Sequence, residues 1–258
     1  MLRMAIKALS VLVDRIRPPM SGPRILIYHQ VGAGSGLQMD VLPDVFRRHM
    51  EWLAYHRKVV PLAHALDAWN DPGSERLVVV SFDDGYRGVF DHAFPVLVEL
   101  GLPFTLYLTT EPIETGRPMS GAPPLTWKQI ALMAESGLAT IGAHTHTHPD
   151  LRDLEPEHIE EELATSNRLI WERVGVEPVH FAYPWGYWSP QADPLVRNSY
   201  VSAVLGGTAS DPQTFDPHRI NRCPVLASDG FVFFRERLRG GLRLEEAIRR
   251  VVRGYRGP

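Results

Sequence analysis

Short apolar runs alternate with longer amphipathic segments along most of the chain. The apolar runs are rich in Val, Ile, Leu, Phe and Tyr and are mostly flanked by Gly, Pro or Asp, which is typical of buried strands. They predict seven strands, over residues 24–31, 77–82, 103–109, 138–143, 179–183, 200–205 and 219–226. Helical periodicity between these runs predicts helices over residues 43–56, 89–100, 126–136, 156–174 and 190–198. Strands that alternate with helices in this way form a parallel sheet, either open or closed into a barrel.

The two ends of the chain have a different pattern, and we treat them as separate from a single domain over residues 21–230. In residues 1–20, one side of a predicted amphipathic helix carries Leu2, Ile6, Leu9, Val13 and Ile16. We expect this apolar side to pack on the domain itself, with peripheral contact to a membrane surface as the alternative. Residues 231–258 predict a basic helical extension, with eight Arg and three Glu between positions 235 and 256. We interpret its charged face as solvated, with anionic lipid or glycan as the alternative partner.

Composition narrows the class of protein without identifying it. Hydrophobic residues make up 44% and charged residues 22% of the 258 residues, which excludes a disordered or fibrous chain. The net charge of −3 argues against a nucleic-acid partner. A single cysteine, Cys223, excludes an internal disulfide and a cysteine-based zinc cluster.

The N-terminus gives no clear signal peptide, because its longest apolar stretch, residues 8–13, ends at Asp14 without a small-residue cleavage site. No segment approaches the 18 or more apolar residues of a membrane span. These observations predict a cytoplasmic protein, with the inner face of the membrane as an alternative location.

Polar clusters follow four of the predicted strands. Asp83 and Asp84 come directly after residues 77–82, and the His-rich run 144–148 follows residues 138–143. Residues 183–188, which are rich in Tyr and Trp, follow the fifth strand, and His29 lies at the end of the first. Parallel α/β folds build their active sites at the carboxyl ends of their strands, so we expect these clusters to share one site.

The His-rich run and the aspartates have the composition of a catalytic metal site. His144 and His148 together with one carboxylate form a three-ligand set that leaves a position open for water. His146 is interpreted as a supporting or solvent-facing residue. Two adjacent carboxylates could alternatively serve a glycosidase, but such a pair flanks a sugar from separate elements, about 5–9.5 Å apart.

Three signatures resemble those of the polysaccharide deacetylase family, also called the NodB-homology domain or carbohydrate esterase family 4. They are Ser81-Phe82-Asp83-Asp84-Gly85, His144-Thr145-His146-Thr147-His148-Pro149 and Phe181-Ala182-Tyr183-Pro184-Trp185-Gly186, in the expected order. The resemblance spans about residues 24–226. It implies an α/β fold, a deformed (β/α)7 barrel in a single domain, that removes acetyl groups from N-acetylated sugars.

The resemblance also implies roles for individual residues. Asp84, His144 and His148 would hold a divalent metal ion, and Asp83 would be the general base. This ligand set favours Zn²⁺, with Co²⁺, Ni²⁺ and Fe²⁺ as alternatives. The residues expected to bind the substrate are Tyr86, Tyr183, Pro184, Trp185, Gly186 and Trp188.

Two departures from the family pattern change these assignments. The third signature usually begins with an arginine that orients the base, but that position is Ala182 here, so Arg219 and Arg222 are the candidates to replace it. The family's C-terminal Leu-x-His, which supplies the general acid, is missing, and His218 is the only histidine after residue 181. Residues 27–31 instead resemble the Tyr-His-x-Val motif of a circularly rearranged branch that includes exopolysaccharide poly-N-acetylglucosamine deacetylases. That likeness implies that His29 is the acid.

The sequence therefore predicts a metal-dependent hydrolase that removes N-acetyl groups from a GlcNAc-type sugar of a bacterial glycan or glycolipid. Two alternatives stay open at this point. One is a deformylase or amidohydrolase that acts on another N-acylated sugar or a small amide. The other is a catalytically silent glycan-binding barrel, because Ala182 interrupts a signature.

Overall fold

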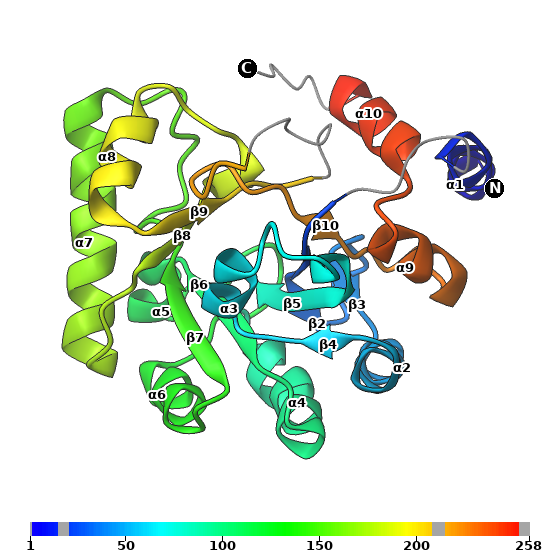
Figure 1. Ribbon diagram of the computed structural model, residues 1–258. Coiled ribbons are helices and arrows are strands. Elements are labelled where there is room, and N and C mark those ends of the chain that lie inside the picture. Colours follow the sequence, from blue (N-terminus) through cyan, green and yellow to red (C-terminus); the bar gives the residue numbers. More distant parts are fainter. Residues whose placement is uncertain (1, 15–20, 208–214, 253–258) are drawn as a thin grey trace.

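The computed structural model describes residues 2–14, 21–207 and 215–252 (Figure 1). Its main sheet has the strand order β10-β1-β5-β6-β7-β8-β9, every neighbouring pair is parallel, and β4 pairs with β5 beside this path. The strands are β1 (Arg24–Tyr28), β4 (Lys58–Val59), β5 (Leu77–Phe82), β6 (Phe104–Leu108), β7 (Ala139–Ala143), β8 (His180–Ala182), β9 (Ser202–Val204) and β10 (Cys223–Pro224). A separate small ladder consists of β2 (Gln30–Val31) and β3 (Asp40–Val41).

The chain before β10 connects the two ends of the sheet. Ile220 forms a parallel bridge with Val204 of β9, and Cys223 pairs with Leu26 of β1. The Leu205 amide also donates a hydrogen bond to the carbonyl of Ile220, at 2.7 Å. Residues 220–224 thus join both edges of the curled sheet. This arrangement confirms the predicted α/β class and the deformed barrel.

Helices cover the outside of the sheet (Figure 1). They are α2 (Pro43–His56), α4 (Phe94–Leu100), α5 (Thr110–Thr115), α6 (Trp127–Glu135), α7 (Pro156–Val174) and α8 (Ala192–Ser199). The short helix α3 (Leu62–Asp67) lies on the opposite face, since its Leu62 and Ala65 belong to the same buried cluster as Val79. The helices predicted over 43–56 and 156–174 are confirmed with the same ends, whereas the one predicted over 89–100 begins with a π-helical turn, Val89–Ala93. The strands β3 and β4 were not predicted, because two residues are too few to give a periodic signal.

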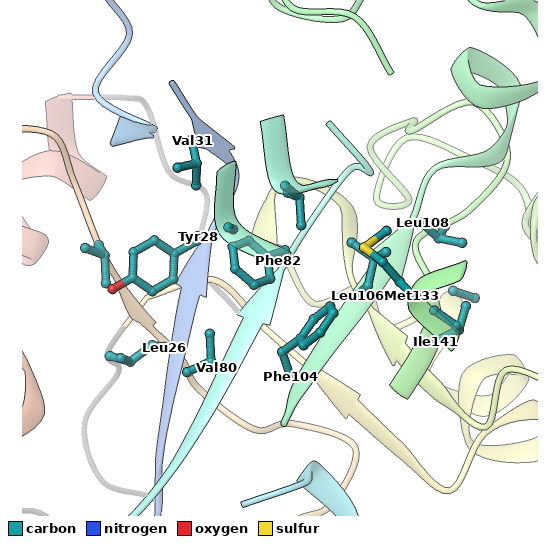
Figure 2. Close-up of a cluster of buried hydrophobic side chains, with 14 of the residues drawn as sticks. Leu26, Tyr28, Val31, Val80, Phe82, Phe104, Leu106, Leu108, Met133 and Ile141 are labelled. Carbon is teal, nitrogen blue, oxygen red and sulfur yellow. The ribbon is translucent and has the colours of Figure 1, made fainter. Parts of the chain in front are cut away.

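Both faces of the sheet are buried, and successive residues of a strand contribute to the apolar clusters on its two faces in turn. Figure 2 shows Tyr28, Phe82 and Phe104 among the side chains of the larger apolar cluster, which packs under the helices. Val79 and Ala182 belong to a second cluster in the interior of the barrel. Side chains alternate between the two faces of a strand, so the phase of each strand determines which residues beyond its end point inward.

Three further helices, α1 (Leu2–Asp14), α9 (Phe231–Leu238) and α10 (Arg243–Val252), lie together at the edge of the fold (Figure 1). The predicted N-terminal helix exists, but the predicted packing side is only partly buried: Ile6 and Val13 are half-buried, and the polar Lys7 and Ser10 are buried more deeply. Leu9 is 53% exposed, whereas Lys7 is fully buried, because Lys7 forms an ion pair with the buried carboxylate of Asp229. Residue 16 and the side chain of residue 2 lie outside the described part of the chain.

The basic C-terminal extension also differs from the prediction, since Arg237 is buried rather than solvated. Its guanidinium contacts Asp229 at 2.5 Å and Glu245 at 2.9 Å. The boundaries at residues 20 and 230 stay predictions. Within the described residues, no helix combines the length and apolar character needed to cross a membrane.

Candidate active site

Strand alternation brings three of the polar clusters into one place. His29, Asp83 and His144 each follow the carboxyl end of a strand by one residue, after Tyr28 of β1, Phe82 of β5 and Ala143 of β7. Tyr28, Phe82 and Ala143 all belong to the cluster under the helices. The residue that follows each of them therefore points to the other face, into the barrel. Tyr28 is in register with Phe82, and the Asp83 amide donates to the Tyr28 carbonyl at 3.0 Å.

Asp84, His144 and His148 form a compact set of potential metal ligands. One ligand atom from each lies within 4.8 Å of the others. Asp84 Oδ1 is 3.5 Å from His144 Nε2 and 3.4 Å from His148 Nε2. Metal–ligand bonds of about 2.1 Å in a tetrahedral zinc site place neighbouring ligands about 3.4 Å apart. The donor types and spacing therefore fit a divalent ion, and a three-ligand set leaves a further position for water.

The His144 imidazole and the backbone of the histidine loop are held by groups outside the triad. His144 Nδ1 lies 2.7 Å from the carbonyl of Ala182, which fixes the proton on Nδ1 and leaves the Nε2 lone pair facing Asp84. The hydroxyl of Thr145 accepts a hydrogen bond from the His148 amide at 3.2 Å and donates to the His144 carbonyl at 2.5 Å. The ligand geometry is thus organised by the protein itself.

His146 points away from the triad. Its Nδ1 contacts the hydroxyl of Thr110 at 2.9 Å, and its amide donates to Glu162 Oε2 at 2.8 Å. Glu162 also accepts hydrogen bonds from the amide and the hydroxyl of Thr147, at 2.8 and 2.6 Å. This support for the loop could not be predicted from the sequence, because Glu162 lies on α7 among other glutamates.

The backbone of the site is strained. Asp84, Thr145, His148 and Trp185 have φ angles of 70°, 67°, 62° and 61°, in the left-handed region that non-glycine residues rarely occupy. Such a conformation costs of order 1–3 kcal/mol per residue and persists only where the surrounding structure enforces it. Two of these residues belong to the triad, and the other two lie in the loops next to it.

Asp83 lies beside the triad and is held by Arg222. The two guanidinium Nη atoms contact the two carboxylate oxygens at 2.6 Å each, and Arg222 Nε donates to the Leu205 carbonyl at 2.9 Å. Both side chains are buried. Burial alone would raise the pKa of Asp83, but Arg222 outweighs this effect and holds the pKa below its usual range. Asp83 is therefore ionised, and its Oδ2 is 3.8 Å from His144 Nε2.

Of the two arginines proposed to replace the motif arginine, only Arg222 contacts Asp83. Arg219 is largely exposed, pairs with Asp193 at 3.3 Å and stacks on Trp188 at 3.9 Å. Asp216 binds it from the other side. Arg219 therefore belongs to a surface ion cluster rather than to the site.

The charges in the site favour a bound cation. Burial would lower the pKa of His144, yet Asp84 and Asp83 raise it above the ordinary value. The pKa of Asp84 is low despite burial, because His144, His29 and His148 stabilise the carboxylate. Two buried carboxylates face a single guanidinium, and the remaining negative charge draws a proton onto His144. A divalent ion would satisfy the same charge and replace that proton.

His29 lies within electrostatic reach of both aspartates. Burial lowers the pKa of its imidazole, and the charges of Asp84 and Asp83 oppose this effect only in part. His218 lies elsewhere, because its Nε2 contacts the Tyr200 carbonyl at 2.8 Å, just before the amino end of β9. The structure thus brings His29, and not His218, to the triad.

The expected substrate-binding residues separate into two groups. Tyr183 was expected to bind the substrate, but it is fully buried and packs against Phe181 under the helices. It continues the outward phase of β8. Trp185, in contrast, is 62% exposed, and its ring lies 5.1 Å from that of His148.

The other residues of this group are less accessible. Pro184 and Gly186 are buried beneath Trp185, and Gly186 has no room for a side chain, since a Cβ would lie 2.4 Å from Gly206. Trp188 is half-buried under Arg219. Tyr86 is buried, and its pKa is raised by that burial and by the charge of Asp84. Among these six residues, Trp185 is the one that offers a broad exposed ring next to the triad.

Comparisons with known proteins agree on one family. A family model described as polysaccharide deacetylase matches residues 70–203, just over half of the chain. YxkH of Bacillus subtilis, a protein named after polysaccharide deacetylases, is 26% identical over 80% of this chain and 74% of its own length. The poly-β-1,6-N-acetyl-D-glucosamine N-deacetylase of Staphylococcus epidermidis is 30% identical over 42% of this chain and 37% of its own. The structure of IcaB from Ammonifex degensii is similar with a TM-score of 0.71 and 25% identity, covering 85% and 97% of the two chains.

The geometry predicts which histidines retain a metal ion. We expect His144→Ala and His148→Ala each to lose bound metal, because each removes one of three ligands, whereas the control His146→Ala retains it. Elemental analysis of the purified variants measures the metal content. Full occupancy in His148→Ala would contradict the ligand assignment.

Proposed function

Since the chain belongs to the polysaccharide deacetylase family, we propose that it is a metal-dependent hydrolase that removes N-acetyl groups from a GlcNAc-type sugar of a bacterial glycan or glycolipid. The observation that carries this proposal is the triad of Asp84, His144 and His148 with the ionised, arginine-held Asp83 beside it. The S. epidermidis relative, named for deacetylation of poly-β-1,6-N-acetyl-D-glucosamine, supports the choice of sugar.

Asp84, His144 and His148 would hold the ion, for which we propose Zn²⁺, with Co²⁺, Ni²⁺ and Fe²⁺ as alternatives. When bound, such an ion lowers the pKa of a coordinated water towards ~7 and polarises the acetamide carbonyl. Asp84 contributes the negative charge of the set, and the Ala182 carbonyl keeps His144 in the tautomer that can bind.

Asp83 is suited to the role of general base. Arg222 keeps it ionised and fixes its plane, and its Oδ2 borders the triad. In the proposed reaction Asp83 takes a proton from the attacking water, whose oxygen forms a bond to the carbonyl carbon. The C–N bond then breaks, which releases acetate and the free sugar amine.

His29 is the proposed general acid. The amine is a poor leaving group, so a positioned acid contributes roughly 10²–10⁴-fold to the rate. His29 points into the barrel from the strand next to Asp83, and both aspartates act on its charge. The exposed ring of Trp185 next to His148 would stack on a sugar and hold the acetamide over the triad.

The proposal predicts acetate release from N-acetylated oligosaccharides. A panel of N-acetyl and N-formyl glucosamine oligomers, assayed for acetate and formate, distinguishes deacetylation from deformylation. Asp83→Asn should keep its metal and lose turnover, because it removes only the base, whereas Asp84→Asn should lose the metal as well. A metal-loaded wild-type protein that binds the oligomers and releases neither acid would instead establish a silent glycan-binding barrel.

The Arg222–Asp83 pair predicts a shift in pH dependence. Arg222→Met removes the charge that lowers the pKa of Asp83, so the base becomes protonated at higher pH. As the pH falls, the variant should therefore lose activity at a pH about 1–3 units higher than the wild type does. The acid limb of the kcat/KM profile measures this, with Arg219→Met as the matched control that leaves the profile unchanged.

Arg222→Met leaves a buried carboxylate unpaired, which costs about 3–5 kcal/mol of stability. A second variant, Arg222→Lys, keeps a positive charge and should move the acid limb less than Arg222→Met does. An acid limb that stays at its wild-type position in a folded Arg222→Met would contradict the assignment of Asp83 as base.

The two candidate acids can be compared directly. His29→Ala should reduce kcat by roughly 10²–10⁴-fold, because it removes the proposed acid that protonates the amine. His218→Ala should retain a near-normal rate, since His218 lies at the other end of the barrel. Both variants are first checked for folding and metal content. Wild-type turnover in a metal-loaded His29→Ala would make His218 the leading candidate.

A further inference from the structure

The helix α1 turns polar residues towards the protein and several apolar residues towards solvent, while its Ile6, Val11 and Val13 are half-buried. Lys7 and Ser10 are fully buried. Met4, Leu9 and Leu12 are 52%, 53% and 64% exposed. This is the reverse of an ordinary surface helix, in which the apolar stripe faces the core.

Ion pairs and hydrogen bonds hold α1 in this orientation. The Lys7 ammonium pairs with Asp229 and lies 3.8 Å from Glu245, while Arg237 binds the same two carboxylates. The Ser10 hydroxyl accepts a hydrogen bond from the Glu245 amide at 3.3 Å. A rotation that turned Leu9 and Leu12 inward would take Lys7 away from Asp229. Since an unpaired buried charge is strongly destabilising, the exposed apolar side is a consequence of the fold.

The neighbouring helix α10 likewise buries polar residues and leaves apolar residues more exposed. Glu245 and Glu246 are buried, at 4% and 5% exposure. Ala247 is exposed, and Leu244 and Ile248 are only half-buried. The Arg243 amide donates to Asp14 Oδ2 at 3.1 Å, which connects the start of α10 to the end of α1. The two helices therefore contact each other through polar groups and direct apolar residues outward.

Positive charge is concentrated in the two terminal stretches of sequence that contain these helices, the second of which begins within α9. Residues 1–20 carry a net charge of +3 and residues 235–256 a net charge of +5, so the rest of this chain of net charge −3 carries −11. A protein partner or a second copy of the chain could bind through the apolar side alone and would not require the positive charge. The charge separation fits a surface that is both apolar and negatively charged.

We propose that the outward side of α1 and α10 docks onto the surface of an anionic phospholipid membrane. The exposed leucines of α1 enter the boundary between headgroups and acyl chains, with the helix axis in the plane of the membrane. The basic residues of these segments, other than the buried and paired Lys7 and Arg237, add attraction to the anionic headgroups, which weakens as salt increases. This inference stands on α1 and α10 alone and does not depend on the proposed catalytic function.

Flotation of the full chain with lipid vesicles tests the proposal. We expect binding to vesicles that contain phosphatidylglycerol, weaker binding to pure phosphatidylcholine, and a decrease at high salt. Leu9→Glu combined with Leu12→Glu should lower the bound fraction at least about tenfold, because it places two charges where apolar side chains enter the lipid. Both positions are exposed in the fold, so circular dichroism should be unchanged.

The matched control combines Leu132→Glu with Trp171→Glu, which makes the same change at positions 45% and 59% exposed on α6 and α7. It should bind vesicles as the wild type does. Wild-type vesicle binding by the α1 variant, or no binding by the wild type, would overturn the proposal. So would a wild-type dimer, seen by sedimentation velocity, that the α1 variant converts to a monomer, since a second copy would then cover this side. Vesicle binding does not require turnover, so this result is independent of the acetate assay.

Discussion

The ion pair between Arg222 and Asp83 joins the closure of the barrel to the chemistry at its carboxyl end. Arg222 belongs to the segment that bridges β9 and β1, and Asp83 follows β5, one strand further along the sheet. Neither charge can be buried without the other. The segment that closes the barrel therefore also fixes the group beside the metal ligands, and displacement of that segment would leave Asp83 without its counter-ion.

Strand phase explains how much of the site could be predicted from the sequence. The apolar runs located the main strands, and the polar residues at their ends defined one edge of the sheet. His29, Asp83 and His144 meet there because each occupies an inward position just beyond its strand. The outer histidines of the His-rich run were identified from their spacing and their place in the signature, and the structure places both beside Asp84.

The remaining features depend on tertiary contacts that periodicity does not record. Arg219 and Arg222 were equivalent candidates until the register of the closing segment showed which one points inward. Tyr183 was expected at the groove because of its place in a signature, yet its strand phase directs it under the helices. The orientation of α1 was predicted from its apolar stripe, but the buried ion pair of Lys7 with Asp229 determines it instead.

The hydrogen bond from His144 to the Ala182 carbonyl has a consequence for the evolution of such barrels. Because the backbone at position 182 orients the imidazole, any side chain that fits can occupy that position without loosening the ligand. The interior of a barrel is accessible from every strand, so a charged group can migrate to a different strand and still reach the same point in space. Here the guanidinium comes from position 222, and sequence patterns that look for it on β8 will overlook proteins arranged in this way.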